Sequence, residues 1–431
     1  MENTSLLSES TNENIYHCIK CGLCLAHCPV YKEVLLEDAS PRGKVQLSKF
    51  VTEGTMPLSK EIKDVLYNTC LLCGSCVANC PSGVHGTNLF SGLRWRATQQ
   101  YGTNWAKKVF YQILSSQWKM SKVAWFGEWA RRNFSGAWIE GKIKVGALGV
   151  EGIPSLNKKP FSQTIEEVTK PKGETKARVL YFHGCATEYL YGAIGDAVVD
   201  VLPRMGVEVI TPQDQACCGL PIFLSGDREV SLQSIRHTLE VFSGKDADAV
   251  IVDCATCGSA LKHEYPHILK ELYDLGLDVT AGEVEAAEEL AAKVKDVTVF
   301  IDEHKDWLPA LEDGNGKEKI RVTYHDPCHL ANVQKVKDQP RNILRALPNV
   351  EFVEMKGAND CCGGGGSFQV EHPETSLKIT SRKIDNIYDT KAQVVATCCP
   401  GCNLTIGDHL DKKKGIEVMH PVQLLQKALN K

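Results

Sequence analysis

Cysteines are the residues of this chain whose number and spacing could do chemistry. The 431 residues include 19 cysteines, and two runs of them share the pattern C-x2-C-x2-C-x3-C-P. The runs contain Cys18, Cys21, Cys24 and Cys28, and Cys70, Cys73, Cys76 and Cys80. Two-residue gaps let three thiolates converge on one iron–sulfur cubane, and the fourth cysteine of such a run usually binds the neighbouring cluster. We therefore expect two [4Fe–4S] clusters, one held by Cys18, Cys21, Cys24 and Cys80, and the other by Cys70, Cys73, Cys76 and Cys28.

Zinc is the alternative metal for these runs, because all-cysteine zinc sites also use C-x2-C pairs. Such a site needs only four thiolates, usually as two separated pairs, so two complete runs favour iron–sulfur clusters over zinc. The 42 positions from Cys28 to Cys70 carry apolar residues at helical spacing. Residues 1–100 are therefore predicted to form a helical, ferredoxin-like domain with two clusters.

The later cysteines form an internal repeat. Each copy has a single cysteine, a double cysteine followed by glycine, and a final C-x2-C pair. The gap before the double cysteine is 31 residues in one copy and 32 in the other, and the gap after it is 35 and 36. Spacings that agree within one residue indicate two copies of one structural unit. The copies contain Cys185, Cys217, Cys218, Cys254 and Cys257, and Cys328, Cys361, Cys362, Cys399 and Cys402.

Strands and helices alternate in both copies of the repeat. Apolar runs such as ARVLYF and IRVTY lead into the first cysteine of each copy, and AVIV and VVA lead into the last pair. This alternation predicts α/β units with a mainly parallel sheet. Ligands of such sheets lie beyond the carboxyl ends of the strands, where the five cysteines of each copy would meet.

These observations predict an α+β multidomain chain. A helical two-cluster domain is followed by two repeated α/β domains, and an aromatic, basic helical segment with a linker lies between the two parts. The expected boundaries are 1–100 for the two-cluster domain, 101–177 for the segment and linker, 178–275 for the first α/β domain, 276–318 for an insert and 319–431 for the second α/β domain.

The repeat resembles the CCG domain of heterodisulfide reductase catalytic subunits and their relatives. Two ferredoxin-type runs followed by two CCG domains resemble the layout of the glycolate oxidase iron–sulfur subunit. Iron–sulfur subunits of D-lactate dehydrogenases and of anaerobic glycerol-3-phosphate dehydrogenase look similar. The resemblance covers about residues 15–100 and 178–430, including the segment CPVYKEVLLEDASPRGKVQLSKF. It implies one or two further [4Fe–4S] clusters at the CCG cysteines, of the non-cubane kind found in those relatives, with zinc as the alternative at one site.

Residues beside the CCG cysteines also have structural interpretations. His183, His325 and His329 each lie within three positions of such a cysteine, and we expect them to donate hydrogen bonds to ligands rather than to bind metal. Asp326 is expected to cap the helix that follows it. Cys398 adjoins a predicted ligand, and we expect it to be a packed thiol.

Composition argues against several classes of protein. The 49 Lys and Arg and 53 Asp and Glu give a net charge of −4, which does not favour nucleic-acid binding. No run of about 18 apolar residues occurs, so no transmembrane helix is expected. The polar N-terminus is unlike a secretory signal. We expect a cytoplasmic protein, or one bound peripherally to the inner face of the membrane.

The segment between the two cysteine-rich parts has its own bias. Six of the seven tryptophans lie between Trp95 and Trp138, and the stretch Arg94–Trp138 has eight Lys or Arg and one acid. This pattern fits an aromatic helical core, a membrane-surface segment or a protein interface. Residues 141–176, which mix Gly, Pro, Lys and Glu, are predicted to be a long linker.

No dinucleotide fingerprint, P-loop or hydrolase motif occurs, so the chain is expected to use the hydride-accepting cofactor of a partner. The resemblance implies the iron–sulfur subunit of an oxidoreductase, inactive alone, that passes electrons from a flavin-containing 2-hydroxy acid dehydrogenase subunit to a quinone or an electron-transfer flavoprotein. Glycolate and D-lactate are the implied substrates. One alternative is a heterodisulfide-reductase-like catalytic subunit with disulfide chemistry at a CCG cluster, and another is a zinc-stabilised scaffold.

Overall fold

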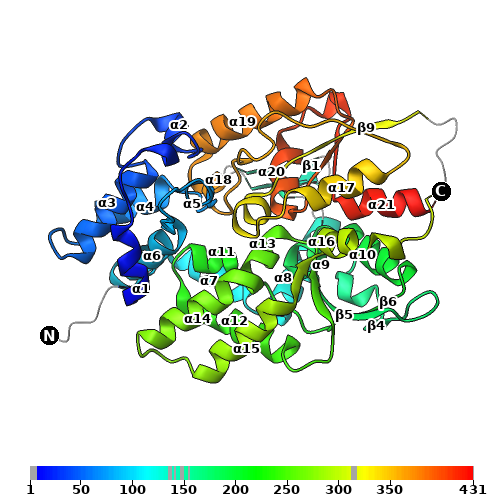
Figure 1. Cartoon of the computed structure of the whole chain (residues 1–431), viewed down its shortest axis with the longest axis horizontal. Coiled ribbons are helices and arrows are strands. Elements are labelled where there is room, and N and C mark those ends of the chain that lie inside the picture. Colours follow the sequence, from blue (N-terminus) through cyan, green and yellow to red (C-terminus); the bar gives the residue numbers. More distant parts are fainter. Residues whose placement is uncertain are drawn as a thin grey trace.

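The computed structural model describes residues 7–133, 138–139, 142–145, 150–153, 156–311 and 318–430. Figure 1 shows three parts: a helical N-terminal domain in blue, a first α/β domain mainly in green, and a second in orange and red. Among the described residues, no helix has both the length and the apolar composition that crossing a membrane requires.

The N-terminal domain is a set of short helices around cysteine-bearing loops. Ser40 and Ser59 cap two of its helices, since their hydroxyls accept the backbone N–H of Gly43 and Ile62. Apolar side chains of several helices form one core that includes Phe90. The elements are α1 (Glu9–Tyr16), η1 (Leu23–Leu25), α2 (Tyr31–Val34), α3 (Pro41–Thr52), α4 (Lys60–Asn68), α5 (Ser75–Ala78) and α6 (Gly86–Tyr101).

Two helices and a small sheet connect this domain to the rest of the chain. They are α7 (Trp105–Leu114), α8 (Gln117–Asn133), β1 (Trp138–Ile139), β2 (Lys142–Val145) and β3 (Val150–Ile153), with antiparallel pairing in the order β1-β2-β3. Strands β2 and β3 lie in the first part of residues 141–176, so paired backbone amides and carbonyls organise that part of the predicted linker. The aromatic-core interpretation holds for Trp95 and Tyr111, which are buried, but not for Trp105, Trp118 and Trp125, which are exposed.

The first α/β domain has a five-stranded sheet in the order β4-β6-β5-β7-β8, and all strands except β4 are parallel. Strand β4 comes from the end of the expected linker. Helix α15 and strand β8 come from the expected insert, so that segment continues this sheet. The elements are η4 (Phe161–Gln163), β4 (Val168–Thr169), β5 (Ala177–Phe182), α9 (Gly184–Tyr189), α10 (Gly192–Arg204), β6 (Val207–Ile210), α11 (Leu220–Leu224), α12 (Arg228–Phe242), β7 (Ala249–Val252), α13 (Ala255–Ser259), η5 (Ala260–Glu264), α14 (Tyr265–Asp274), α15 (Ala281–Lys293), β8 (Val294–Asp296), α16 (Val297–Glu303) and η6 (Lys305–Trp307).

The second α/β domain repeats this strand order. Its four parallel strands lie in the order β10-β9-β11-β12, which matches β6-β5-β7-β8 of the first domain. The elements are β9 (Ile320–Tyr324), η7 (His329–Val333), α17 (Asp338–Ala346), β10 (Val350–Phe352), α18 (Phe368–Glu371), α19 (Pro373–Asp389), β11 (Val394–Ala396), α20 (Pro400–His409), η8 (Lys412–Lys414), β12 (Glu417–Met419) and α21 (Pro421–Leu429).

The central strands are buried on both faces. Val179 and Tyr181 of β5 point into one core, and Leu180 and Phe182 of the same strand point into another. Continuous apolar runs are typical of parallel strands covered on both sides. One of the two cores extends into the second domain, where it includes Val322 and where α10 packs against α21. This shared core fixes the two cysteine-rich domains against each other.

Candidate metal centres

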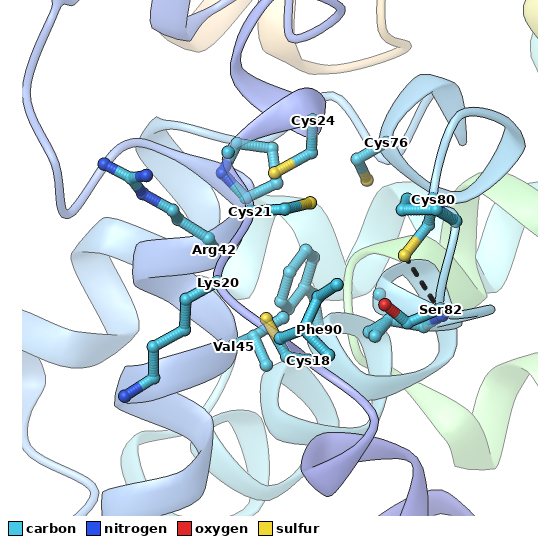
Figure 2. A pocket seen from close by; sticks show the side chains of 16 residues that line it. Cys18, Lys20, Cys21, Cys24, Arg42, Val45, Cys76, Cys80, Ser82 and Phe90 are labelled. Carbon is cyan, nitrogen blue, oxygen red and sulfur yellow. Dashed lines mark hydrogen bonds between the residues drawn. The ribbon is translucent and has the colours of Figure 1, made fainter.

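The first pocket lies between the loop after α1 and the chain around α5 (Figure 2). Its cysteines are Cys18, Cys21, Cys24, Cys76 and Cys80, and much of the remaining lining is apolar, including Phe90. It encloses about 460 Å³ of empty space, its open mouth included. Gly22, with a φ of +82°, supplies the left-handed turn between Cys21 and Cys24 that a side chain would resist. Cys80, from the second run, thus faces the cysteines of the first run.

The second pocket is lined by Cys28, Cys70, Cys73 and Cys76. The backbone N–H of Tyr31 donates to Sγ of Cys28, and that of Leu72 donates to Sγ of Cys70, both over 3.4 Å. Amides that point at sulfur in this way stabilise thiolates and tune an iron–sulfur cluster. Cys28, from the first run, thus faces cysteines of the second run, so each pocket combines cysteines of both runs.

Burial controls the protonation of these thiols. It raises the pKa of Cys73 to about 11 and that of Cys76 well above its ordinary value. The thiols of Cys73 and Cys76 therefore keep their protons at neutral pH, and a metal has to displace those protons when it binds. Two apolar pockets, each lined by at least four soft sulfur donors, fit iron–sulfur clusters.

The first CCG cysteines lie at the carboxyl ends of three adjacent parallel strands. Cys185 follows β5, Cys217 and Cys218 follow β6, and Cys254 and Cys257 follow β7. Hydrogen bonds from the thiols of Cys217 and Cys257 hold the pKa of Cys218 well below its ordinary value. The same contact, together with Cys254 and burial, raises the pKa of Cys257.

Gly184 allows these sulfurs to converge. Its φ is +64°, and a Cβ on it would lie only 2.9 Å from Sγ of Cys257. A side chain at this position would therefore both strain the backbone and displace the sulfur. Gly184 directly precedes Cys185. Because it has no side chain, the segments that carry Cys185 and Cys257 can approach each other closely.

The second CCG set has the same placement. Cys328 follows β9, Cys361 and Cys362 lie in the loop after β10, and Cys399 and Cys402 follow β11. The sulfurs of Cys362 and Cys402 are 3.4 Å apart. Hydrogen bonds from the thiols of Cys361 and Cys402 hold the pKa of Cys362 well below its ordinary value, as for Cys218 in the first set.

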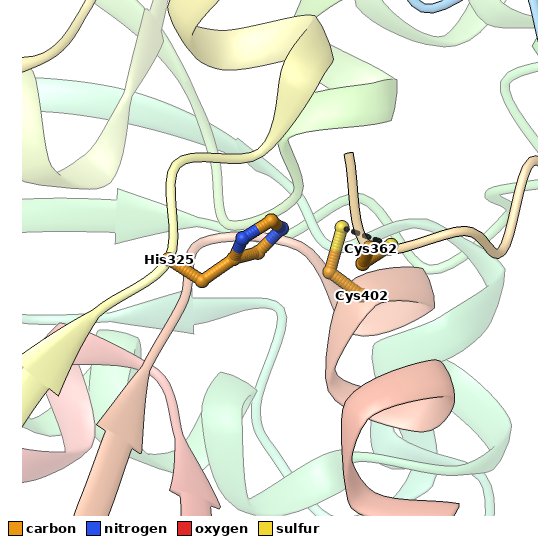
Figure 3. A group of neighbouring side chains, drawn as sticks. All are labelled: His325, Cys362 and Cys402. Carbon is orange, nitrogen blue, oxygen red and sulfur yellow. Dashed lines mark hydrogen bonds between the residues drawn. The ribbon is translucent and has the colours of Figure 1, made fainter. Parts of the chain in front are cut away.

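His325 belongs to this second set. Its ring points toward the sulfurs of Cys362 and Cys402 (Figure 3), and the three ligand atoms lie within 4.8 Å of one another. All three side chains are buried. The structure therefore places His325 where it can donate a hydrogen bond to a bound ligand sulfur or itself complete a zinc site.

The two CCG sets meet at Cys254 and Cys399. A hydrogen bond between these side chains lowers the pKa of Cys399. The hydroxyl of Thr256 lies 3.6 Å from Sγ of Cys399 and 3.3 Å from Nδ1 of His329. The backbone N–H of Ala255 also donates to the carbonyl of Cys398 over 2.8 Å. The sulfurs of both CCG sets therefore form one continuous row.

The second pocket adjoins the second CCG set. Cys73 and Cys361 belong to one buried apolar cluster, which Cys28 and Cys328 border. The side-chain amide of Asn332 donates to the carbonyl of Cys73 over 3.0 Å, which ties η7 to the N-terminal domain. The four cysteine sets thus follow one another in space as first pocket, second pocket, second CCG set and first CCG set.

Some supporting residues are not recognisable from sequence. The buried guanidinium of Arg94 donates to the carbonyls of Leu66, Cys70 and Leu224, which joins α6 to a cysteine loop and to the first α/β domain. Arg94 stands in a basic stretch that suggests a surface, so no sequence signal marks it. A buried arginine could be recognised only from the unpaired carbonyls around it.

Three residues singled out in the sequence have defined surroundings. The prediction that Asp326 caps the following helix is wrong, because its carboxylate pairs with the guanidinium of Arg341 at 2.7 and 2.8 Å and η7 has no side-chain cap. Cys398 is fully buried, and the hydroxyl of Tyr324 donates to its sulfur over 3.4 Å. His183 is buried, and its Nδ1 lies 3.1 Å from the carbonyl oxygen of Gly184.

Comparisons with known proteins match this architecture. The 4Fe-4S dicluster domain family matches residues 14–84, and the cysteine-rich CCG domain family matches residues 179–262 and 322–407. A probable glycolate oxidase iron-sulfur subunit of Bacillus subtilis is 29% identical over 439 residues, covering 96% of this chain and 94% of that protein.

Two further relatives differ in what their names describe. Lactate utilization protein A of Oceanobacillus iheyensis is 31% identical over 249 residues, which cover 58% of this chain and 96% of that protein. One of the subunits of the dihydromethanophenazine:CoB–CoM heterodisulfide reductase of Methanosarcina acetivorans is 26% identical over 443 residues, which cover 96% of this chain and 93% of that protein.

Proposed function

The chain belongs to the family of iron–sulfur oxidoreductase subunits in which a 4Fe-4S dicluster domain precedes two CCG domains, and from this membership we propose that it is the electron-transfer subunit of a flavin-dependent 2-hydroxy acid dehydrogenase complex. The partner subunit would oxidise glycolate or D-lactate at its flavin. A quinone or an electron-transfer flavoprotein would receive the electrons. The continuous row of four cysteine sets is the observation that carries this proposal.

The proposed ligands follow the observed neighbourhoods. Cys18, Cys21, Cys24 and Cys80 would hold one cubane, and Cys28, Cys70, Cys73 and Cys76 the other. The five cysteines of each CCG set would hold a further cluster, with zinc as the alternative in one set. Iron–sulfur clusters supply one-electron transfer when bound. The chain's own residues bury most of the CCG sulfurs and aim backbone amides at Cys28 and Cys70.

Anaerobic purification tests the proposal. About 16 irons per chain with little zinc would support four clusters, at ~4 irons each, whereas about 8 would restrict clusters to the N-terminal pockets. Co-purification of a flavoprotein, and reduction of the chain by glycolate or D-lactate only when that flavoprotein is present, would support the role in a complex. A chain that neither 2-hydroxy acid reduces through any co-purified flavoprotein would contradict it.

Reductive cleavage of a disulfide is a second candidate function. The contact between Cys254 and Cys399 supports it, because two complete CCG sets meet there. Such cleavage consumes two electrons and two protons and releases two thiols. Oxidation of a reduced viologen dye by a small disulfide, dependent on this chain, would favour this function over electron transfer alone.

A further inference from the structure

The outer faces of α7 and α8 carry large aromatic side chains. Trp105 of α7 is 77% exposed, and Trp118 and Trp125 of α8 are 64% and 69% exposed. Phe110 and Phe126 are exposed as well. Folded proteins rarely leave this much aromatic surface in water unless another surface covers it. The two helices pack against each other and lie partly behind the green helices in Figure 1.

Positive charge accompanies the aromatic residues. Helices α7 and α8 contain six Lys or Arg and one acid, Glu128, although the whole chain has a net charge of −4. Trp118, Lys122 and Trp125 lie at positions i, i+4 and i+7, so they share one face of α8. Nζ of Lys122 lies 3.7 Å from the centre of the Trp118 ring. Aromatic rings and ammonium groups are therefore interleaved on the exposed face.

The inner faces of the two helices hold them to the first α/β domain. Tyr111 packs against Ile222 and Val230 of the first α/β domain. Met120 packs against Tyr189, whose hydroxyl lies 2.9 Å from that of Ser121. The helix pair is held by these contacts, so its exposed tryptophans are not needed for its own packing.

The kind of basic residue on these helices distinguishes between two surfaces that could cover them, a partner protein and a membrane. Protein interfaces are enriched in arginine and depleted of lysine. Four of the six basic residues of α7 and α8 are lysines: Lys107, which pairs with Glu371 at 2.6 Å, Lys108, Lys119 and Lys122. Arg131 and Arg132 belong to the last turn of α8. Tryptophan with lysine is typical of helices in the membrane interface, where the lysine stem stays among apolar groups and the ammonium reaches the headgroups. Anionic lipids complement this charge.

We propose that the outer faces of α7 and α8 dock onto the surface of a membrane that contains anionic lipid. The first CCG set lies directly behind them. The backbone N–H of Cys217 donates to the carbonyl of Leu114, the last residue of α7, over 3.4 Å, and Cys185 borders the apolar cluster that contains Met120. Docking therefore places this set about one helix diameter, ~10 Å, behind the membrane surface.

This position selects a membrane quinone rather than an electron-transfer flavoprotein as the acceptor. The choice of a quinone as the electron acceptor rests on the proposed function, whereas the docking of α7 and α8 onto a membrane does not. The two are therefore tested by separate measurements, one of vesicle binding by the isolated chain and one of electron transfer by the complex.

Vesicle flotation with the full-length, anaerobically purified chain tests the docking. We expect binding to vesicles of phosphatidylcholine with 30% phosphatidylglycerol (about three in ten lipids), weaker binding to phosphatidylcholine alone, and loss of binding in high salt. The double variant Lys108→Glu and Lys122→Glu should bind at least about tenfold more weakly, since each lysine near an anionic surface contributes about fivefold. The matched control is Lys245→Glu with Lys378→Glu, which also reverses two exposed charges, one in the loop after α12 and one on α19, and should leave binding unchanged.

Tryptophan fluorescence locates the contact. Lipids with brominated acyl chains should quench the wild-type chain on binding, and the triple variant Trp105→Phe, Trp118→Phe and Trp125→Phe should bind vesicles with most of this quenching lost. Equal iron content in all variants shows that they fold.

Three results would overturn the docking: no binding to anionic vesicles, equal binding by the Lys108→Glu, Lys122→Glu variant, or loss of the flavoprotein partner in that variant without vesicle binding by the wild type. If vesicles bind as expected but the double variant leaves quinone reduction by the complex unchanged, the docking stands and the quinone step falls.

Discussion

Replacing Gly184 with alanine tests whether the first CCG set holds a cluster. A Cβ at this position would lie 2.9 Å from Sγ of Cys257, and the φ of +64° is one that side chains resist. Gly244 offers a matched control, because its φ is +69° and a Cβ there would have no atom within 4 Å. Gly184→Ala and Gly244→Ala thus share the backbone strain and differ in the sulfur contact.

Two effects of Gly184→Ala can be compared in size: the strain of its backbone and the displacement of Sγ of Cys257. A left-handed conformation costs an alanine about 1–2 kcal/mol, and both variants bear this cost. A carbon and a sulfur atom in contact need at least about 3.5 Å, so Cys257 would have to retreat by about 0.6 Å in Gly184→Ala. Metal sites tolerate changes of only about 0.2 Å in ligand distance. The sulfur therefore has to leave its ligand position, and we expect the loss of about 4 irons per chain.

Iron analysis and electron paramagnetic resonance of both variants, purified without oxygen, provide the measurement. Gly184→Ala should lose the signal of one site and keep the others, and Gly244→Ala should match the wild type. Equal iron and identical spectra in the two variants would refute the assignment of Cys257 as a ligand. Loss of the same iron in Gly244→Ala would show that backbone strain, not the sulfur contact, empties the site.

Three further predictions follow from the geometry. Cys80→Ser should remove the cluster held by the first run, and Cys28→Ser should remove the cluster held by the second run, with a loss of about 4 irons in each case. If resonance spectra show instead that Cys80→Ser removes the cluster of the second run and Cys28→Ser that of the first, the placement of Cys80 in the first pocket and Cys28 in the second is contradicted. Arg94→Met leaves three backbone carbonyls without their buried hydrogen-bond donor. The free energy of unfolding, measured in urea, should therefore fall by about 2–4 kcal/mol. A loss below about 1 kcal/mol would mean that water replaces the guanidinium. Burial raises the pKa of Asp296 to about 6, above its value of 3.8 when exposed, so the folded state binds this proton more tightly. The contribution of Asp296 to the free energy of unfolding is complete below about pH 4 and falls as pH rises through 6. Relative to the Asp296→Asn variant, the wild type should lose about 1 kcal/mol of unfolding free energy between pH 5 and pH 7, as measured by denaturant titration. Parallel pH profiles of the two proteins would contradict this.

The elements that carry the CCG cysteines could be predicted because their signals are local. A strand such as β7, with the sequence AVIV, is buried on both faces and therefore appears as an unbroken apolar run. The repeat spacing then places each cysteine just after a strand, and parallel strands bring their carboxyl ends to one edge. No knowledge of the rest of the molecule is needed for these two steps.

The segments between the domains could not be predicted in the same way. Strand β8 is three residues long with the sequence VKD, and it is a strand because it pairs with β7. Strand β4 has two residues and depends likewise on β6. In such short strands the pairing partner, rather than the propensity of the residues, decides the conformation. The prediction that Asp326 caps a helix failed for a related reason, since its partner Arg341 is fifteen residues away and meets it only after folding.

The order of the four cysteine sets is also set by packing between domains. The shared core of α10 and α21 brings Cys254 against Cys399, and Asn332 binds the loop of Cys73. The row that results has two different ends. At one end Cys21 is exposed in a partly open pocket, which a partner subunit could approach. At the other end the first CCG set lies behind α7 and α8 and their exposed tryptophans. Because the two ends present different surfaces, the proposed flavoprotein and the proposed membrane surface would occupy different parts of the chain and would not compete for one site.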